Sequence, residues 1–316
     1  MTQVKNGKGA TTLSQFTRTL DPVGNPTLVA TLRGATTTNE AMQYDVSNRL
    51  TKWCQAASCT GATKWISYAY DAVGNRAQQV RTGVATAGTT NYTYDAADQM
   101  TSSVGGTTTT NSTYDADGNQ LTQGTTAFTY DLAGRMTSNK IGTATATNYT
   151  YDGDGNRRTR ATGTTVNTKY SWDTLNPLPE LALERNNSNA LIRRYVQGPA
   201  GPVSMATSAT ATFYYHRDHL GSITDVTSNT GAAQWRYDYE PYGAQLTATK
   251  VVTSAPVNPT RFTGEYLDTE LADYNLRARQ YNPATGRFRA TDPITPARTD
   301  QYVSAYAYAN DRPGVY

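Results

Sequence analysis

The chain has 316 residues, of which 37% are hydrophobic and 17% charged, and its formal net charge is +3. Both fractions are below ordinary globular values of about 45–50% and about 25%, which argues against one thick aliphatic core, while 23 tyrosines and the low net charge argue against disorder. The same values give no support for nucleic-acid binding, no apolar run suggests a membrane span, and the first ten residues lack the apolar region of a signal peptide.

From the N-terminus onward, the dipeptide Tyr-Asp recurs at intervals of 16 to 26 residues. It occurs at Tyr44-Asp45, Tyr70-Asp71, Tyr94-Asp95, Tyr114-Asp115, Tyr130-Asp131 and Tyr151-Asp152, and Trp172-Asp173 is a variant. Self-similarity at this spacing indicates a repeat protein. Four of the pairs have an aromatic residue two positions upstream, such as Tyr68 or Phe128, which places both rings on one face of a β-strand.

A turn follows each Tyr-Asp pair. In four of these turns Asp stands first and Gly fourth, the preference of a type I turn whose last residue adopts positive φ. The four glycines are Gly74, Gly118, Gly134 and Gly155. Asn48 and Asp98 take this position in two other units, and Asp21-Pro22-Val23-Gly24 predicts a degenerate unit before Tyr44. The residues therefore predict an all-β chain built of repeated β-hairpins.

Cys54 and Cys59 lie within the repeat array and enclose four residues. A local disulfide across a hairpin end and a pair of free thiols both fit this spacing. Zinc would need two further ligands, and both histidines are more than 150 positions away. We therefore expect no metal here and no cofactor elsewhere in the chain.

The repeat spacing changes after Trp172, and prolines appear at Pro177 and Pro179. We therefore expect a repeat array over residues 1–174 and a distinct C-terminal region over residues 175–316. Alternating apolar residues at 181–183 and 191–196 predict two strands around the turn 186–189, and a bend follows at 198–202.

The segments YAYDAVGNR, FTYDLAGRM and YTYDGDGNR resemble the YD repeat. The C-terminal third, with YYHRDHLGSITDV, WRYDYEPYG, RARQYNPATGRF and YAYANDRP in this order, resembles the RHS repeat-associated core. The resemblance implies a hairpin sheet that spirals around a cavity, a core that plugs one end, and a toxic C-terminal polypeptide held inside as cargo. It also implies a secreted or cell-surface protein of bacterial type, and a chain that starts within repeat-like sequence suggests a fragment whose export signal lies upstream.

The same resemblance implies a candidate catalytic pair, Arg279 and Asp292. In toxin-shell proteins of this family the core cuts its own chain as an aspartyl protease, with one Asp in the Asp-Pro after the Gly-Arg-Phe motif and a second in a later Asp-Pro-x-Gly motif. Two adjacent carboxylates can share one proton and divide the roles of base and acid. Asp292 fills the first position and Arg279 the assisting one, but the second motif is missing from this sequence. A structural turn role for Asp292 is the alternative.

His216 and His219 are the only histidines, and Asp218 lies between them. This spacing suggests a metal or acid–base site, but the resemblance implies a turn before a strand, in which polar side chains bond local backbone. We favour the structural interpretation.

Three functions fit the sequence. The first is a shell fragment that encloses or presents a C-terminal toxin polypeptide. The second is a carbohydrate-binding or adhesion module that presents Tyr and Asp to glycans, and the third is a self-cleaving protease that is incomplete in this chain. Exposed sheet edges would also permit self-association. No turnover, nucleic-acid partner or membrane span is expected.

Overall fold

The computed structural model describes residues 2–294 and 304–314, and in this part the chain is almost entirely β-structure. The strands of the large sheet are β1 (Gln3–Lys8), β2 (Thr11–Leu20), β3 (Pro26–Arg33), β4 (Thr36–Tyr44), β5 (Leu50–Cys54), β6 (Trp65–Tyr70), β7 (Arg76–Thr82), β8 (Gly88–Tyr94), β9 (Met100–Gly105), β10 (Thr108–Tyr114), β11 (Gln120–Gln123), β12 (Thr126–Tyr130), β13 (Met136–Ile141), β14 (Thr147–Tyr151), β15 (Arg157–Thr162), β16 (Thr165–Asp173), β17 (Glu180–Arg185), β18 (Leu191–Gly198), β19 (Gly201–Ala206), β20 (Thr212–Arg217), β21 (Ile223–Ser228), β22 (Ala233–Tyr239) and β23 (Gln245–Lys250). A second, four-stranded sheet consists of β24 (Tyr266–Asp268), β25 (Asp273–Leu276), β26 (Arg279–Asn282) and β27 (Arg287–Phe288). Two 3-10 helices, η1 (Phe262–Gly264) and η2 (Ala309–Asp311), complete the described elements.

The large sheet is an antiparallel meander, in which each strand pairs with the next one along the chain from β1 to β23. The predicted hairpins are confirmed. In a meander, alternate turns lie on opposite edges of the sheet, so all the Tyr-Asp turns share one edge. We call the sheet β1–β23 the wall.

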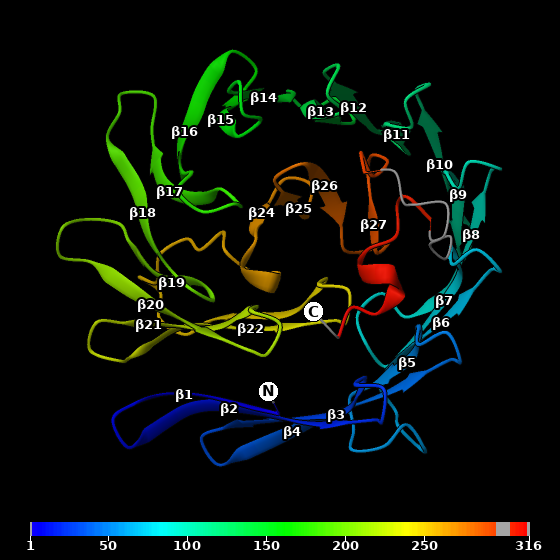
Figure 1. Cartoon of the computed structure of the whole chain (residues 1–316), viewed down its shortest axis with the longest axis horizontal. Helices are drawn as coiled ribbons and strands as arrows, with labels where there is room; N and C mark the ends of the chain where they lie inside the picture. Colours follow the sequence, from blue (N-terminus) through cyan, green and yellow to red (C-terminus); the bar gives the residue numbers. More distant parts are fainter. Residues whose placement is uncertain (1, 295–303, 315–316) are drawn as a thin grey trace.

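The curvature of the wall has a recurrent local cause. The strand register shifts immediately before Tyr44, Tyr70, Tyr94, Tyr114, Tyr130 and Tyr151, that is, at each Tyr of the repeat. A β-bulge inserts an unpaired residue, bends its strand and increases the local twist. Repetition of this irregularity at one edge explains why the wall curls into a ring instead of extending as an open sheet (Figure 1).

The two ends of the wall overlap. Figure 1 shows β1 to β4 outside β20 to β22, so the sheet spirals slightly more than once around. Side chains join the layers: Asn6 donates to the carbonyl of Arg217 at 2.9 Å, and Arg33 Nη1 lies 2.6 Å from Asp238 Oδ1. Strand β21, which is covered on both faces, is buried at five of its six residues.

The interior of the ring is occupied by residues 251–294 and 304–314, which we call the plug (Figure 1). Its aromatic residues Phe262, Tyr274 and Tyr281 form a buried cluster of their own. The cavity expected inside the sheet is therefore filled, along this stretch of wall, by the chain's own C-terminal part. The boundary expected at residue 174 stays a prediction, and the hydrogen-bonded sheet continues across that position to Lys250.

The described residues contain no helix that is long and apolar enough to cross a membrane.

Candidate functional site

The Asp of each repeat holds its turn together. In the unit at Asp71, Oδ1 accepts the backbone N–H groups of Val73 at 3.0 Å and Asn75 at 2.8 Å, while Oδ2 accepts the side-chain amide of Asn75 at 3.1 Å. Equivalent backbone bonds occur at Asp21, Asp45, Asp95, Asp115, Asp131, Asp152 and Asp218. The expected glycines close these turns with positive φ, which is 94° at Gly74 and 71° at Gly134. These residues are thus structural, as the hairpin interpretation requires.

In four of the six repeats the Tyr bonds to the unit before it. Its hydroxyl donates to the carbonyl of the first strand residue after the preceding turn, as in Tyr70 to Leu50 at 2.6 Å and Tyr94 to Arg76 at 2.8 Å. The same bond joins Tyr44 to Pro26 and Tyr151 to Met136, and Trp172 uses its indole N–H toward Arg157. Tyr114 instead packs edge-on against Tyr306 of the plug, and Tyr130 packs against the cluster of Phe128, Met136 and Tyr149.

A buried charge pair anchors the plug to the wall. Arg157, the residue after a repeat turn, lies 2.8 Å from Asp268 of β24, and both side chains are almost fully buried. Burial would lower the pKa of the Arg157 guanidinium, but Asp268 together with Tyr151 and Tyr149 outweighs this effect and holds the pKa well above its usual value. The guanidinium also stacks on the ring of Tyr149, 4.1 Å from its centroid. One arginine therefore connects a repeat turn, a repeat aromatic and the plug.

In addition, two arginines of the plug donate hydrogen bonds to the wall. Arg289 forms a buried ion pair with Asp273 and donates to the side-chain oxygen of Gln120 at 2.8 Å. Arg287 donates to the side-chain oxygen of Asn75 at 2.9 Å. Backbone contact adds to these bonds, since the amide of Gln120 donates to the carbonyl of Arg289 at 2.8 Å.

Repeat turns also contact the plug directly. The hydroxyl of Tyr306 donates to the carbonyl of Gly118 at 2.7 Å, and a Cβ at Gly118 would lie only 2.6 Å from that hydroxyl. Arg312 donates to Asn25 at 2.8 Å, in the turn between β2 and β3. The shared turn edge of the wall thus forms a binding surface for the plug. No property of the isolated repeat predicts these contacts, because the partners are 188 and 287 residues apart.

Arg279 and Asp292 lie side by side in the plug. Arg279 Nη2 is 2.8 Å from Asp292 Oδ2, and the guanidinium stacks on Phe288, 3.6 Å from the ring centroid. Burial lowers the pKa of Arg279 despite the nearby carboxylate. The Asp292 side chain is 37% exposed and its other oxygen accepts the backbone N–H of Ile294 at 3.0 Å. The structure brings the two expected residues together, and their role in cleavage stays a prediction.

Asp311 is a buried carboxyl that our sequence reasoning did not single out. Burial raises the pKa of Asp311 to about 6, although Arg76, Arg287 and Arg49 oppose the shift. Its side chain faces Tyr242, whose hydroxyl lies 3.4 Å from Asp311 Oδ1. The residues next to Asp311 in the sequence do not indicate that it is buried, because Tyr242 and Arg76 come from distant parts of the chain.

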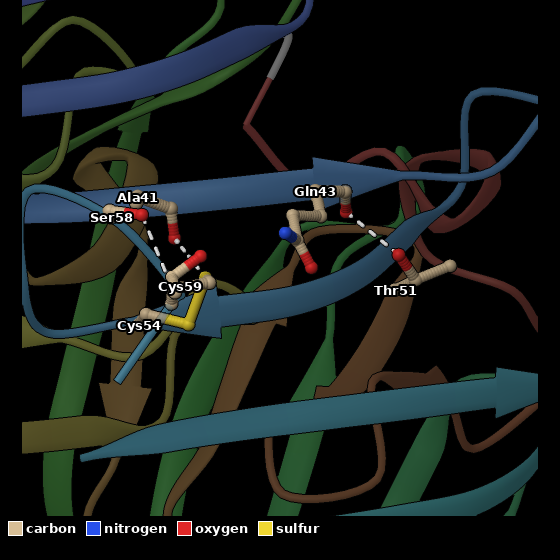
Figure 2. The surroundings of a disulfide bond; sticks show 7 residues. Ala41, Gln43, Thr51, Cys54, Ser58 and Cys59 are labelled. Atoms are coloured by element: carbon tan, nitrogen blue, oxygen red, sulfur yellow. Dashed lines mark hydrogen bonds between the residues drawn. A yellow bond between two sulfur atoms is a disulfide. The ribbon is translucent and has the colours of Figure 1, made fainter. Parts of the chain in front are cut away.

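Cys54 and Cys59 form a disulfide with a Cα–Cα distance of 5.3 Å, and Figure 2 shows it at the end of β5 beside Ala41. It closes a short loop after β5. Of the two alternatives that fit the spacing, the structure thus contains the local disulfide.

His216 and His219 lie on either side of the turn residue Asp218, in partly buried positions. His216 Nε2 lies 2.9 Å from the hydroxyl of Thr227, and burial lowers the pKa of His219 to about 3. Asp218 between them is a turn residue that accepts the backbone N–H groups of Leu220 and Ser222. Within residues 2–294 and 304–314, no group of three or more His, Cys, Asp or Glu side chains is placed to hold a metal ion.

Comparison with known proteins gives consistent matches. The family model described as Teneurin YD-shell matches residues 9–314. The tRNA nuclease WapA of Bacillus subtilis (strain 168) is 27% identical over 296 residues, which is 93% of this chain and 10% of that protein. Double-stranded DNA deaminase toxin A of Burkholderia cenocepacia (strain H111) is 32% identical over 93 residues, 29% of this chain and 6% of the relative.

Solved structures are similar over nearly the whole chain. The crystal structure of TcdB2-TccC3-Cdc42 matches with a TM-score of 0.74 and 18% identity, covering 96% of this chain and 17% of that one. TcdB2-TccC3 without its hypervariable C-terminal region matches with a TM-score of 0.61 and 17% identity, covering 96% and 18%. At these identities the likeness shows the fold. The chain spans about a tenth of the length of WapA and less than a fifth of these structures.

Proposed function

Because the chain belongs to the Teneurin YD-shell family, we propose that it forms a turn of shell wall closed by its own plug, within a longer protein that encloses a C-terminal polypeptide. The observation that supports this proposal is the convergence of the repeat turns on the plug, through the buried Arg157–Asp268 pair and the bond from Arg289 to Gln120. A wall that only presented a surface would not need charged groups buried at its interior edge. Separating Arg157 from Asp268 would leave a buried charge without its partner, which is costly, so this pair resists detachment of the plug.

The enclosed partner in this proposal is a toxic polypeptide. The names of two relatives describe a tRNA nuclease and a DNA deaminase toxin, and this chain aligns with only 10% and 6% of them. We assign those activities to other parts of such proteins, and to this chain a structural role without turnover. Export to the cell surface or the medium belongs to the same proposal, since a toxin must leave the cell that makes it.

The Arg279–Asp292 pair would serve release of the cargo. Asp292 is partly exposed and its Oδ2 is held by Arg279, which supports a role in which a following segment would bring a second carboxylate beside it. The two carboxylates would share a proton, one acting as base on water and the other as acid on the leaving amine. Arg279 would keep the pair in a singly charged state. Alone, Asp292 cannot perform both roles.

The test is to express the chain with the coding sequence that follows it and to measure cleavage by mass spectrometry. We expect cleavage after a downstream Asp-Pro-x-Gly motif, its loss in Asp292→Asn and slower cleavage in Arg279→Ala. The 316-residue chain alone should stay intact from pH 4 to 8. Asp154→Asn, which changes an exposed turn residue, is the matched control and should cleave normally.

Encapsulation is tested separately on the cleaved full-length protein, because the plug fills the interior of this one turn of wall (Figure 1). The released fragment should elute with the wall in size-exclusion chromatography and resist added protease until a denaturant opens the wall. If the fragment elutes separately and is digested at once, the wall does not enclose it and the proposal is wrong, whatever the cleavage result.

A further inference from the structure

A groove opens where β15 and β16 diverge. The two strands pair only from Thr159, opposite Lys169, to Thr162, opposite Thr165, so the part of each strand nearer the Asp152 turn is free of the other. The resulting space has a volume of about 540 Å³. Its lining residues are Asp152, Arg158, Thr159, Lys169, Tyr170, Ser171, Trp172, Thr174, Arg185 and Asn189.

Three of these residues are cations: Arg158, Lys169 and Arg185. Lys169 and Arg185 stand directly opposite each other on neighbouring strands, an arrangement that destabilises a sheet. Among the twelve ion pairs found within the described residues, none involves any of the three. The acid that lines the groove, Asp152, is already bonded to the backbone N–H groups of Asp154 and Asn156.

The turn between β17 and β18 fixes two of the cations. Lys169 Nζ donates to the carbonyl of Asn187 at 2.8 Å and to Asn189 Oδ1 at 2.9 Å, and Arg185 Nη1 donates to the carbonyl of Asn189 at 3.0 Å. Neutral acceptors thus hold two like charges together without neutralising them. The remaining N–H groups of Arg185 and those of Arg158 are free to bind an anion.

The fold itself does not require this charge. The corresponding groove between β3 and β4 arises in the same way, because those strands pair only from Leu28 to Arg33. It has a similar volume, about 510 Å³, but it is lined by Asp21, Asn25, Thr27, Met42, Gln43, Tyr44, Asp45, Asn48 and Thr51, with no cation. Of these two grooves, therefore, only the β15–β16 groove has a cationic lining.

We propose that the β15–β16 groove binds a phosphorylated sugar. Arginine presents a planar fork of donors that matches phosphate oxygens, and charge-assisted bonds of this kind are the strong ones. The hydroxyls of Thr159, Ser171 and Thr174 and the ring of Trp172 supply polar and apolar surface for the sugar beside the phosphate. This site is independent of the plug and of the proposed encapsulation.

The test is isothermal titration of the intact chain with glucose 6-phosphate, inorganic phosphate and glucose. We expect saturable binding of glucose 6-phosphate, at least about tenfold tighter than either of the other two. Arg185→Gln and Lys169→Gln should each weaken it about tenfold. Thermal unfolding should change little, because each variant loses bonds to the β17–β18 turn but also removes a like-charge contact. Arg194→Gln is the matched control, an exposed cation on β18 outside the groove, and should bind normally.

Three results would overturn the proposal. They are the absence of saturable binding, equal affinity for inorganic phosphate and for the sugar phosphate, or equal losses in Arg194→Gln and in the groove variants. The second result would show a groove that selects the anion without the sugar, and the third would show a general effect of surface charge.

Discussion

At the scale of residues, four of the six Tyr-Asp pairs, at Tyr44, Tyr70, Tyr94 and Tyr151, combine two bonds that differ in range. The Asp caps its own turn within four residues, as Asp71 does with Asn75, and this bond is readable from the order of residues alone. The Tyr donates to a carbonyl of the preceding unit, 18 residues earlier for Tyr94. That acceptor is backbone and has no side-chain signature. The turn was therefore predictable, and the bond that joins repeat to repeat was not.

Substitution of the turn glycines tests whether these turns require a residue with positive φ. Gly74→Val and Gly134→Val place a β-branched side chain at positive φ and should each lower the free energy of unfolding by about 1–3 kcal/mol. Chemical denaturation of each variant checks this. Gly153→Val is the control, since Gly153 is in an open turn position without positive φ, and it should change stability little. Equal losses at all three positions would contradict the assignment of a special backbone role to Gly74 and Gly134.

Asp311 gives a pH dependence of definite sign. Burial raises the pKa of Asp311 from 3.8 to about 6, so the folded state prefers the protonated carboxyl. This contribution to stability is fully present below the ordinary value and is lost as the pH rises through about 6. From pH 4 to 7 it should lower the free energy of unfolding by about 1–3 kcal/mol. Glu40, whose pKa burial raises to about 7, changes stability in the same direction.

The measurement is denaturation at a series of pH values. Asp311→Asn should reduce the slope of the profile between pH 4 and 7 and leave the part that Glu40 contributes, and Asn tolerates the positive φ at this position. A variant with the slope of the original protein would show that Asp311 is not the group responsible.

At the scale of elements, sequence periodicity predicts hairpins but not how they pack. The two strands expected around residues 186–189 are present as β17 and β18, because alternation and turn residues are local properties. The plug contacts depend on residues such as Arg157 and Asp268, which are 111 positions apart. Nothing in either segment indicates its partner. The proximity of Arg279 and Asp292 is predicted only by the resemblance to the RHS core.

The buried Arg157–Asp268 pair should dominate the attachment of the plug. Arg157→Gln leaves Asp268 as an uncompensated buried charge and should cost about 3–5 kcal/mol of unfolding free energy. The matched control is Arg135→Gln, which removes a partly exposed ion pair with Asp131 and should cost at most about 1 kcal/mol. Denaturation curves of both variants provide the comparison. Similar costs for the two would mean that the plug contact has no special weight.

At the scale of the whole molecule, the wall is a spiral rather than a closed barrel. The hydrogen-bonded order runs from β1 to β23, and the overlap of its ends is held by side chains such as Arg33 and Asp238. Both end strands therefore keep one edge without a neighbouring strand within the described residues, the condition under which self-association through sheet edges was expected. The interior of this turn of the spiral is filled by the plug, whose aromatic residues pack where a cavity was expected.

The most direct test of the account is hydrogen–deuterium exchange of the intact chain, followed by mass spectrometry of peptides from β24 to β27. If the plug is locked inside the wall by a buried charge pair, the amides of Tyr274 and Tyr281 should exchange as slowly as those of β21, which is covered on both faces. Exchange as fast as that of the exposed turn at residues 186–189 would show a plug that leaves the wall freely, and would contradict the claim that the wall is closed by its own C-terminal part.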